Sequence, residues 1–389
     1  MPASNVHPNL HRFPGAISSA GAFVLFASTI AALTVSLCCF VRGIALLPQG
    51  PAVAIAEVTK SVANSGSLTP QYFHDVRRDA AALGNATHSD VWQDVFALDQ
   101  HGELRPKHSL LSSLFAVPFY WLFGNAGFWI LQQVLFLGLL GSTYTLVKRS
   151  TGLALPWSTL VSTLLLTQSI FYCYSFSYDL HGCAVLMGGL CIMSVCPTLG
   201  AAIMTLSIFV RPTYILLILP LTFGTMRFDD KKRCGKVALG VGLVLVLFGL
   251  FNYYMWGNPL LTAYSRLPGF RNGEMVLSPT SIGFDLSVFL SRWEEKVFSS
   301  RGLLPYNLSV VALPLVVVSL WRARDRFRWT CFLSATAYTL YIFSYPMWDT
   351  TSNGNRFLMP AIYLYLLCFI PVIGGAELRY LHGESPKKS

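Results

Sequence analysis

The stretch VALGVGLVLVLFGLFNYYMW, residues 237–256, contains no charged side chain. An α-helix of this length, rising about 1.5 Å per residue, crosses the roughly 30 Å hydrocarbon core of a bilayer. Comparable apolar stretches recur along the chain, only 12% of its residues are charged, and its mean hydropathy is +0.53. These features predict an all-α polytopic membrane protein.

We predict about eight full membrane spans and one interrupted stretch. The interrupted stretch contains Arg211-Pro212 at its middle, where a charge is costly in lipid and proline breaks the helical hydrogen-bond ladder. We interpret it as a broken re-entrant pair, 198–210 and 213–226, that enters the bilayer and returns. A single kinked span whose arginine reaches the interface is the alternative. The full spans are 18–47, 125–147, 153–173, 181–196, 237–256, 303–321, 329–347 and 356–376.

Lysine and arginine in the short loops set the orientation of the chain. They cluster at Lys148-Arg149, in 227–236, in 322–328 and in the tail 377–389. With Arg12, these clusters account for the whole net charge of +10, because the remaining acidic and basic residues balance. The broken pair brings 227–236 to the same side as the other clusters. We assign that side, with both termini, to the cytoplasm, and the charge needs no nucleic-acid partner to explain it.

The first outer loop, 48–124, is long and rich in acids. A transporter normally places its chemistry between helices near the bilayer midplane, so an acidic loop of this size indicates a reaction at the membrane surface. Two of its parts, 52–63 and 108–124, are predicted to be helices that lie in the interface with membrane lipids. Three of its acids lie among turn-like residues and are expected to be solvated: Asp90, Asp94 and Asp99.

Four segments, in order along the chain, resemble the glycosyltransferase C superfamily. They are GELRPKHSLL (102–111) with Pro118-Phe119-Tyr120 and Leu122-Phe123-Gly124, NYYMWGNPL (252–260) with Tyr264, SSRGLLPY (299–306), and Trp348 with NGNRFLMP (353–360). This superfamily of multi-span enzymes takes a sugar from a polyprenyl-phosphate carrier and includes protein O-mannosyltransferases and lipid A aminoarabinose transferases.

The resemblance implies a single transmembrane glycosyltransferase domain over 1–376, followed by a cytoplasmic tail, 377–389. Its donor would be a polyprenyl-phosphate-linked sugar, and its acceptor a lipid, a glycan or a protein. The small size and the absence of a soluble domain after 376 suggest a bacterial inner-membrane enzyme of the cell envelope, with its active site on the outer face.

The resemblance also points to catalytic carboxylates, with one departure. Members of the superfamily place an Asp or an Asp-Glu pair just after the first span, where this chain reads PQGP (48–51). The nearest replacements as the base that activates the acceptor are Glu57, Asp75 and Asp79, each of which has an ion-paired or surface role as its alternative. Asp179 follows a tyrosine at a turn where some members carry an acid, and it is expected to line the site.

Cations near the outer face are candidates for binding the donor. Arg211, Arg301 and Arg356 lie where spans meet that face, and a guanidinium matches phosphate oxygens bidentately, although each alone is compatible with an anchor at the interface. Other predicted substrate-binding residues are Lys107, His108, His181 and Tyr264. Within residues 18–376 no His-x-x-x-His or equivalent spacing is present, so neither a metal site nor a cofactor is predicted, and a divalent metal is left open.

Two other functions remain as alternatives. A transporter or flippase of lipid-linked sugars predicts internal repeats, and none occurs at matching positions in the two halves. A glycan polymerase or ligase that uses a lipid-pyrophosphate donor shares the basic residues on the outer face.

Overall fold

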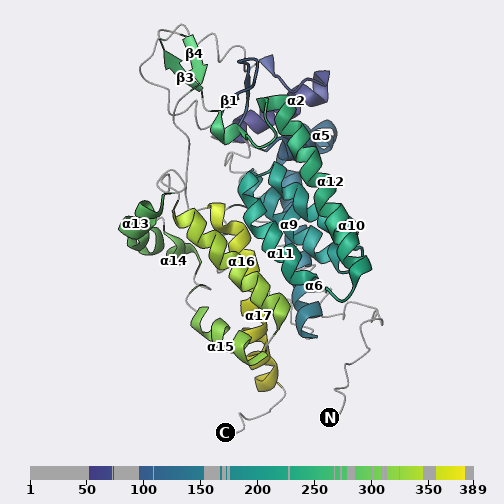
Figure 1. Cartoon of the computed structure of the whole chain (residues 1–389), viewed down its shortest axis with the longest axis vertical. Coiled ribbons are helices and arrows are strands. Elements are labelled where there is room, and N and C mark those ends of the chain that lie inside the picture. Colours follow the sequence, from purple (N-terminus) through teal and green to yellow (C-terminus); the bar gives the residue numbers. More distant parts are fainter. Residues whose placement is uncertain are drawn as a thin grey trace.

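A computed structural model of the chain describes residues 52–71, 73, 96–107, 109–152, 167–168, 172, 176–226, 228–266, 268–271, 274–277, 285–299, 302–307, 310, 313–323, 325–344 and 356–381. These residues form an elongated bundle of helices, and a group of shorter elements lies at one of its ends (Figure 1).

The described elements follow one another as helices interrupted by two short β-hairpins. The helices are α2 (Ala52–Ser65), α5 (Leu110–Phe123), α6 (Ala126–Thr151), α9 (Tyr178–Met193), α10 (Pro197–Leu206), α11 (Ile215–Thr225), α12 (Lys231–Trp256), α13 (Leu286–Phe298), α14 (Leu303–Tyr306), α15 (Leu313–Ala323), α16 (Arg326–Phe343) and α17 (Met359–Leu381). The hairpins are antiparallel and pair β1 (Phe96–Leu98) with β2 (Leu104–Pro106), and β3 (Pro268–Arg271) with β4 (Glu274–Leu277). Single 3₁₀ turns cover Ser207–Phe209, Pro212–Tyr214, Ala263–Ser265 and Arg356–Leu358.

Helix α17 forms the centre of the largest hydrophobic core. Its residues 361–370 are buried on every side, and it contacts α6, α9, α15 and α16. A helix that is apolar all round must be covered either by other helices or by lipid, and neighbouring helices cover α17. The sequence of α17 therefore accounts for its central place in the bundle.

Helix α12 differs, because its apolar residues also face outward. Leu239, Leu243, Val246 and Leu250 are exposed, a surface typical of contact with lipid. Of the described helices, α6 and α12 are long and apolar enough to cross a membrane by length and composition. The predicted span 18–47 lies outside the described residues, so the number of spans stays a prediction.

The stretch predicted to be broken does break at Arg211. Helix α10 and its 3₁₀ turn end there, Arg211 is extended at φ −144° and ψ 118°, and Pro212 begins the next turn. A Cβ on Gly200 would lie 2.0 Å from the backbone nitrogen of Met193, and one on Gly189 would lie 2.2 Å from that of Met204, so α10 packs antiparallel to α9. Helix α11 then returns: Gly224, near its end, lines one cavity together with Arg149, at the end of α6. The chain thus comes back to the end from which α10 began.

We call that end of the bundle the basic end and the opposite one the outer end. The basic end carries Arg149, Arg233 and Arg326, which belong to three of the predicted cytoplasmic clusters. The outer end is marked by the start of α9. Helix α12 runs from the basic end at Lys231 to the outer end at Trp256, where the short elements gather (Figure 1). The orientation of these ends across a membrane stays a prediction.

Helices α2 and α5 match the two helices predicted in the first outer loop and pack on each other. The hydroxyl of Ser113 donates to the carbonyl of Ile55 at 3.1 Å, and the Trp121 indole donates to Ala63 at 2.9 Å. Helix α5 leaves Trp121, Leu122 and Phe123 exposed near its end. Exposed aromatic and aliphatic side chains of this kind suit the membrane interface.

The expectation that Asp99 is solvated was wrong. The residue is buried, and its carboxylate accepts from the backbone N–H groups of His101 and Glu103 and pairs with Arg105 Nε at 2.9 Å. Burial by itself would raise the pKa of Asp99, but these donors outweigh it and lower the pKa. Asp99 therefore closes the turn of the β1–β2 hairpin. Asp90 and Asp94 lie outside the described residues.

Candidate functional site

Three charged residues meet at the outer end of the bundle. Asp179 lies in the first turn of α9, Arg211 in the break between α10 and α11, and Arg356 in the turn that leads into α17. Arg211 Nε lies 2.5 Å from Asp179 Oδ1, and Arg356 Nε lies 3.3 Å from Oδ2. One carboxylate thus faces two guanidinium groups, and the charged cluster carries one net positive charge.

The charged cluster is enclosed to different degrees. The side chain of Asp179 is fully buried and that of Arg211 is 6% exposed, whereas that of Arg356 keeps 25% of its exposure. Charges taken out of water are tolerated only when they are paired and hydrogen-bonded. This requirement explains why Asp179 and Arg211, from segments far apart in the sequence, are found together.

Aromatic residues support the charged cluster. The hydroxyl of Tyr178 accepts from Arg211 at 3.5 Å and from Arg356 at 3.2 Å. Beneath Arg211 lies the ring of Phe357, with its centroid 3.8 Å from the guanidinium carbon, a cation–π contact. The hydroxyl of Tyr214 donates to the backbone carbonyl of Asp179 at 3.3 Å. Sequence reasoning missed these three aromatic residues, although Tyr178 and Phe357 adjoin predicted site residues.

A cavity of about 330 Å³ opens beside the charged cluster. Arg211 and Phe357 form part of its wall, together with Thr213, Tyr341 and Tyr264. The cavity therefore combines a guanidinium group with hydroxyl and aromatic groups, a lining suited to an anionic group joined to a polar or ring-shaped one. Two of the residues predicted for substrate binding, Arg211 and Tyr264, meet here.

Lys107, another residue predicted for substrate binding, lies over the ring of Tyr264. Its Nζ is 5.4 Å from the centroid of the tyrosine ring. Both residues line a second, smaller cavity of about 50 Å³, together with Asn252 and Trp256. Tyr264 thus forms part of the wall of both cavities, one lined also by Arg211 and the other by Lys107.

His181 lies apart from this arrangement, between α9 and α6. Its Nε2 lies 2.9 Å from Oε1 of Gln132, and its ring packs edge-on against Phe176 at 4.9 Å. The residue is fully buried. These contacts with Gln132 and Phe176 are typical of a packed core residue, and the predicted role of His181 in substrate binding stays untested.

The predicted base also remains open. Glu57 is half-buried on α2 and pairs with Lys60 of the same helix at 2.8 Å. Among the residues that the structure describes, no group of three or more His, Cys, Asp and Glu side chains is placed to hold a metal ion. Four predicted site residues lie outside the described ranges: Asp75, Asp79, His108 and Arg301.

Comparison with known proteins identifies a shared fold. No protein-family model and no curated protein matches the chain. The crystal structure of the aminoarabinose transferase ArnT from Cupriavidus metallidurans, in the apo state, is similar with a TM-score of 0.55 and 15% sequence identity. The similarity covers 93% of this chain and 61% of that one, so the chain spans less than two thirds of the length of ArnT. The fold implied by the resemblance in the sequence is thereby confirmed.

Proposed function

We propose that this chain is a membrane glycosyltransferase that moves a sugar from a polyprenyl-phosphate donor to an acceptor on the noncytoplasmic face. The observation that carries the proposal is the charged cluster of Asp179, Arg211 and Arg356 beside the 330 Å³ cavity. The fold shared with an aminoarabinose transferase supports a bacterial inner-membrane enzyme of this kind.

The chemistry requires a group that stabilises the departing phosphate. In the reaction, a hydroxyl oxygen of the acceptor bonds to the anomeric carbon, the bond from that carbon to the phosphate oxygen breaks, and the hydroxyl proton passes to a base. The phosphate leaves with one more negative charge on its oxygens. Cations placed in advance where charge develops lower the barrier, and the net positive charge of the cluster supplies such a place.

Asp179 suits a positioning role better than that of the base. Each of its two oxygens faces a guanidinium group, and its side chain has no exposure through which it could reach an acceptor hydroxyl. A general base must lie within hydrogen-bond reach of the proton that it takes, or one water away. We therefore assign the base to the first outer loop, where Glu57, Asp75 and Asp79 remain the candidates.

The test is a transfer assay with purified protein, radiolabelled polyprenyl-phosphate sugars and a panel of lipid, glycan and protein acceptors. Arg356→Gln is the decisive variant because Arg356 is the most exposed member of the charged cluster. Loss of one group that stabilises developing charge costs around 10²–10³-fold in turnover, and we expect a loss of that order. The matched control is Arg292→Gln, which removes an exposed arginine that pairs with Glu295 on α13.

Three results would overturn the proposal. Full turnover by Arg356→Gln would show that the charged cluster takes no part in the reaction. Transfer only from lipid-pyrophosphate sugars would favour a polymerase or ligase. Movement of lipid-linked sugar across proteoliposomes, with no transfer from any donor, would favour a transporter or flippase.

A further inference from the structure

A third cavity, larger than the two at the outer end, lies at the basic end, opposite the charged cluster. Its volume is about 490 Å³, and α6, α9, α11, α12 and the start of α16 surround it. Three arginines line it: Arg149, Arg233 and Arg326. The proposed transfer reaction uses none of them.

The three arginines contact neutral partners in the part of the chain that the structure describes. Arg149 donates to the carbonyl of Cys191 at 2.8 Å, and Arg326 to that of Phe223 at 3.2 Å. The contact of Arg233 with the carbonyl of Met193, at 3.4 Å, is the longest. Each guanidinium has five N–H donors, so further N–H groups remain available for a ligand. Hydrogen bonds to neutral carbonyl groups do not neutralise the positive charge.

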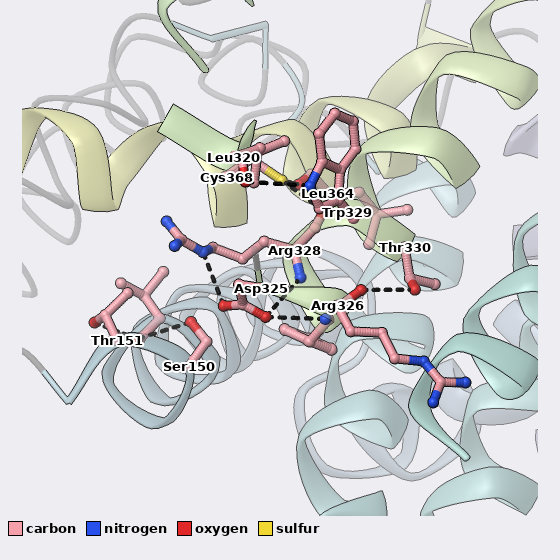
Figure 2. A network of polar contacts seen from close by, with 12 residues as sticks. Ser150, Thr151, Leu320, Asp325, Arg326, Arg328, Trp329, Thr330, Leu364 and Cys368 are labelled. Atoms are coloured by element: carbon pink, nitrogen blue, oxygen red, sulfur yellow. Dashed lines mark hydrogen bonds and ion pairs between the residues drawn. The ribbon is translucent and has the colours of Figure 1, made fainter. Parts of the chain in front are cut away.

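The acid in the wall of this cavity, Asp325, is already engaged. It pairs with Arg328 Nε at 2.9 Å and accepts from the backbone N–H groups of Phe327 and Arg328 at the start of α16. Figure 2 shows Arg328 turned onto this carboxylate, while the guanidinium of Arg326 points away from it. Nearby Asp230 likewise accepts from the backbone of Arg233 as the cap of α12. The cavity therefore has a surplus of positive charge.

The remaining wall combines hydroxyl groups, from Ser150, Ser194 and Thr225, with apolar side chains. Leu146, Leu190, Met193 and Met226 line the cavity and are themselves buried. Guanidinium groups and apolar side chains in one wall suit a molecule that joins an anionic group to an apolar chain. Basic pockets between membrane helices on the cytoplasmic side bind anionic lipid headgroups in this way.

We propose that this cavity binds the phosphate headgroup of an anionic phospholipid from the leaflet at the basic end. The lipid would bridge α6, α12 and α16 through Arg149, Arg233 and Arg326. Free phosphate shares the anion but lacks the apolar chain, so it should bind far more weakly than the lipid.

The experiment is native mass spectrometry of the full chain in nanodiscs of phosphatidylglycerol or of zwitterionic phosphatidylcholine. The double variant Arg233→Gln/Arg326→Gln should retain at least about tenfold less phosphatidylglycerol than the native chain, since each substitution removes a guanidinium charge that would pair with the phosphate. The control Lys231→Gln/Lys232→Gln removes two exposed charges of the same end that do not line the cavity. We expect it to stay within about twofold of the native chain, as exposed charges contribute little.

The result can fail in three distinguishable ways. An equal loss in the lysine control would mean general attraction between the basic end and the membrane. Equal retention of both lipids would remove the dependence on anionic charge. Displacement of phosphatidylglycerol by millimolar inorganic phosphate would make the cavity a site for a small free anion. The variant Arg326→Lys keeps the positive charge at an exposed position. If it retains the lipid, the loss in the double variant comes from the missing charge and not from a damaged fold.

Discussion

Replacing Asp179 with Asn converts a carboxylate into an amide of the same size at the centre of the charged cluster. The native side chain has no exposure and faces Arg211 at 2.5 Å and Arg356 at 3.3 Å. The variant leaves two guanidinium groups side by side without a counterion, where little water can screen them. We therefore expect a large loss in the free energy of unfolding.

The size of the loss in unfolding free energy depends on which arginine can turn toward solvent. Arg356 retains 25% of its exposure and can turn toward solvent, whereas Arg211 retains 6% and cannot. Removal of one partner of a buried pair costs about 3–5 kcal/mol, because the other charge stays buried and unpaired. In the double variant Asp179→Asn/Arg211→Met that charge is gone. The double variant should therefore lose less unfolding free energy than the two single variants lose together, by about 1–3 kcal/mol.

The assay is reversible unfolding of the native chain, the two single variants and the double variant in mixed micelles of increasing SDS content. Tryptophan fluorescence monitors the unfolding. Size-exclusion chromatography selects folded, monodisperse protein before each titration. If the two single losses add to within about 0.5 kcal/mol, Asp179 and Arg211 are independent. The pairing at the outer end would then be refuted, together with the positioning role given to Asp179.

Two further predictions concern packing and topology. A Cβ added at Gly240 would lie 2.3 Å from the carbonyl oxygen of Thr198, whereas one added at Gly242 of the same helix meets nothing within 4 Å. Gly240→Ala should therefore lower the free energy of unfolding by about 1–3 kcal/mol. Gly242→Ala should leave this free energy unchanged or raise it by up to about 1 kcal/mol. Equal effects of the two substitutions in the same SDS titration would contradict the packing of α10 on α12. A cysteine at exposed Asp229, on a background without the nine native cysteines, should react with an impermeant maleimide from the cytoplasmic side alone, and reaction from outside would refute the orientation of the broken pair.

The break at Arg211 could be predicted from the sequence because its causes are local. A guanidinium group in an apolar stretch and a proline beside it each disfavour an uninterrupted helix, whatever surrounds them. The same reasoning placed Asp179 and Arg356 toward the same end of the bundle. It could not show that one carboxylate pairs with both arginines, because that depends on how α9 and the turn before α17 lie side by side.

For His181, helical geometry could have separated it from Asp179, although the two residues are close in the sequence. It stands two residues from Asp179, and the two were grouped as one site. Residues two apart on an α-helix point in different directions, and both lie within α9. Asp179 accordingly meets Arg211, whereas His181 meets Gln132 of α6.

Asp99 shows a similar limit for the loop acids. Its surroundings, Leu-Asp-Gln-His-Gly, were interpreted as a solvated turn, and a turn is present. Asp side chains accept from backbone N–H groups a few residues on and so close such turns. What the sequence did not reveal is that Arg266, from a distant segment, donates to the carbonyls of Leu98 and Asp99 and covers the hairpin.

The charged cluster gives one set of contacts two tasks, which bears on any study of its variants. Asp179 and Arg211 fix the break between α10 and α11 against the start of α9, so their loss alters the bundle as well as the cavity. Arg356 contacts the same carboxylate at the longer distance of 3.3 Å and remains partly exposed. A phosphate that arrived at the outer end could draw Arg356 from Asp179 without leaving the acid unpaired, because Arg211 would still hold it. Arg356 is therefore the residue whose substitution separates binding of an anion from maintenance of the fold.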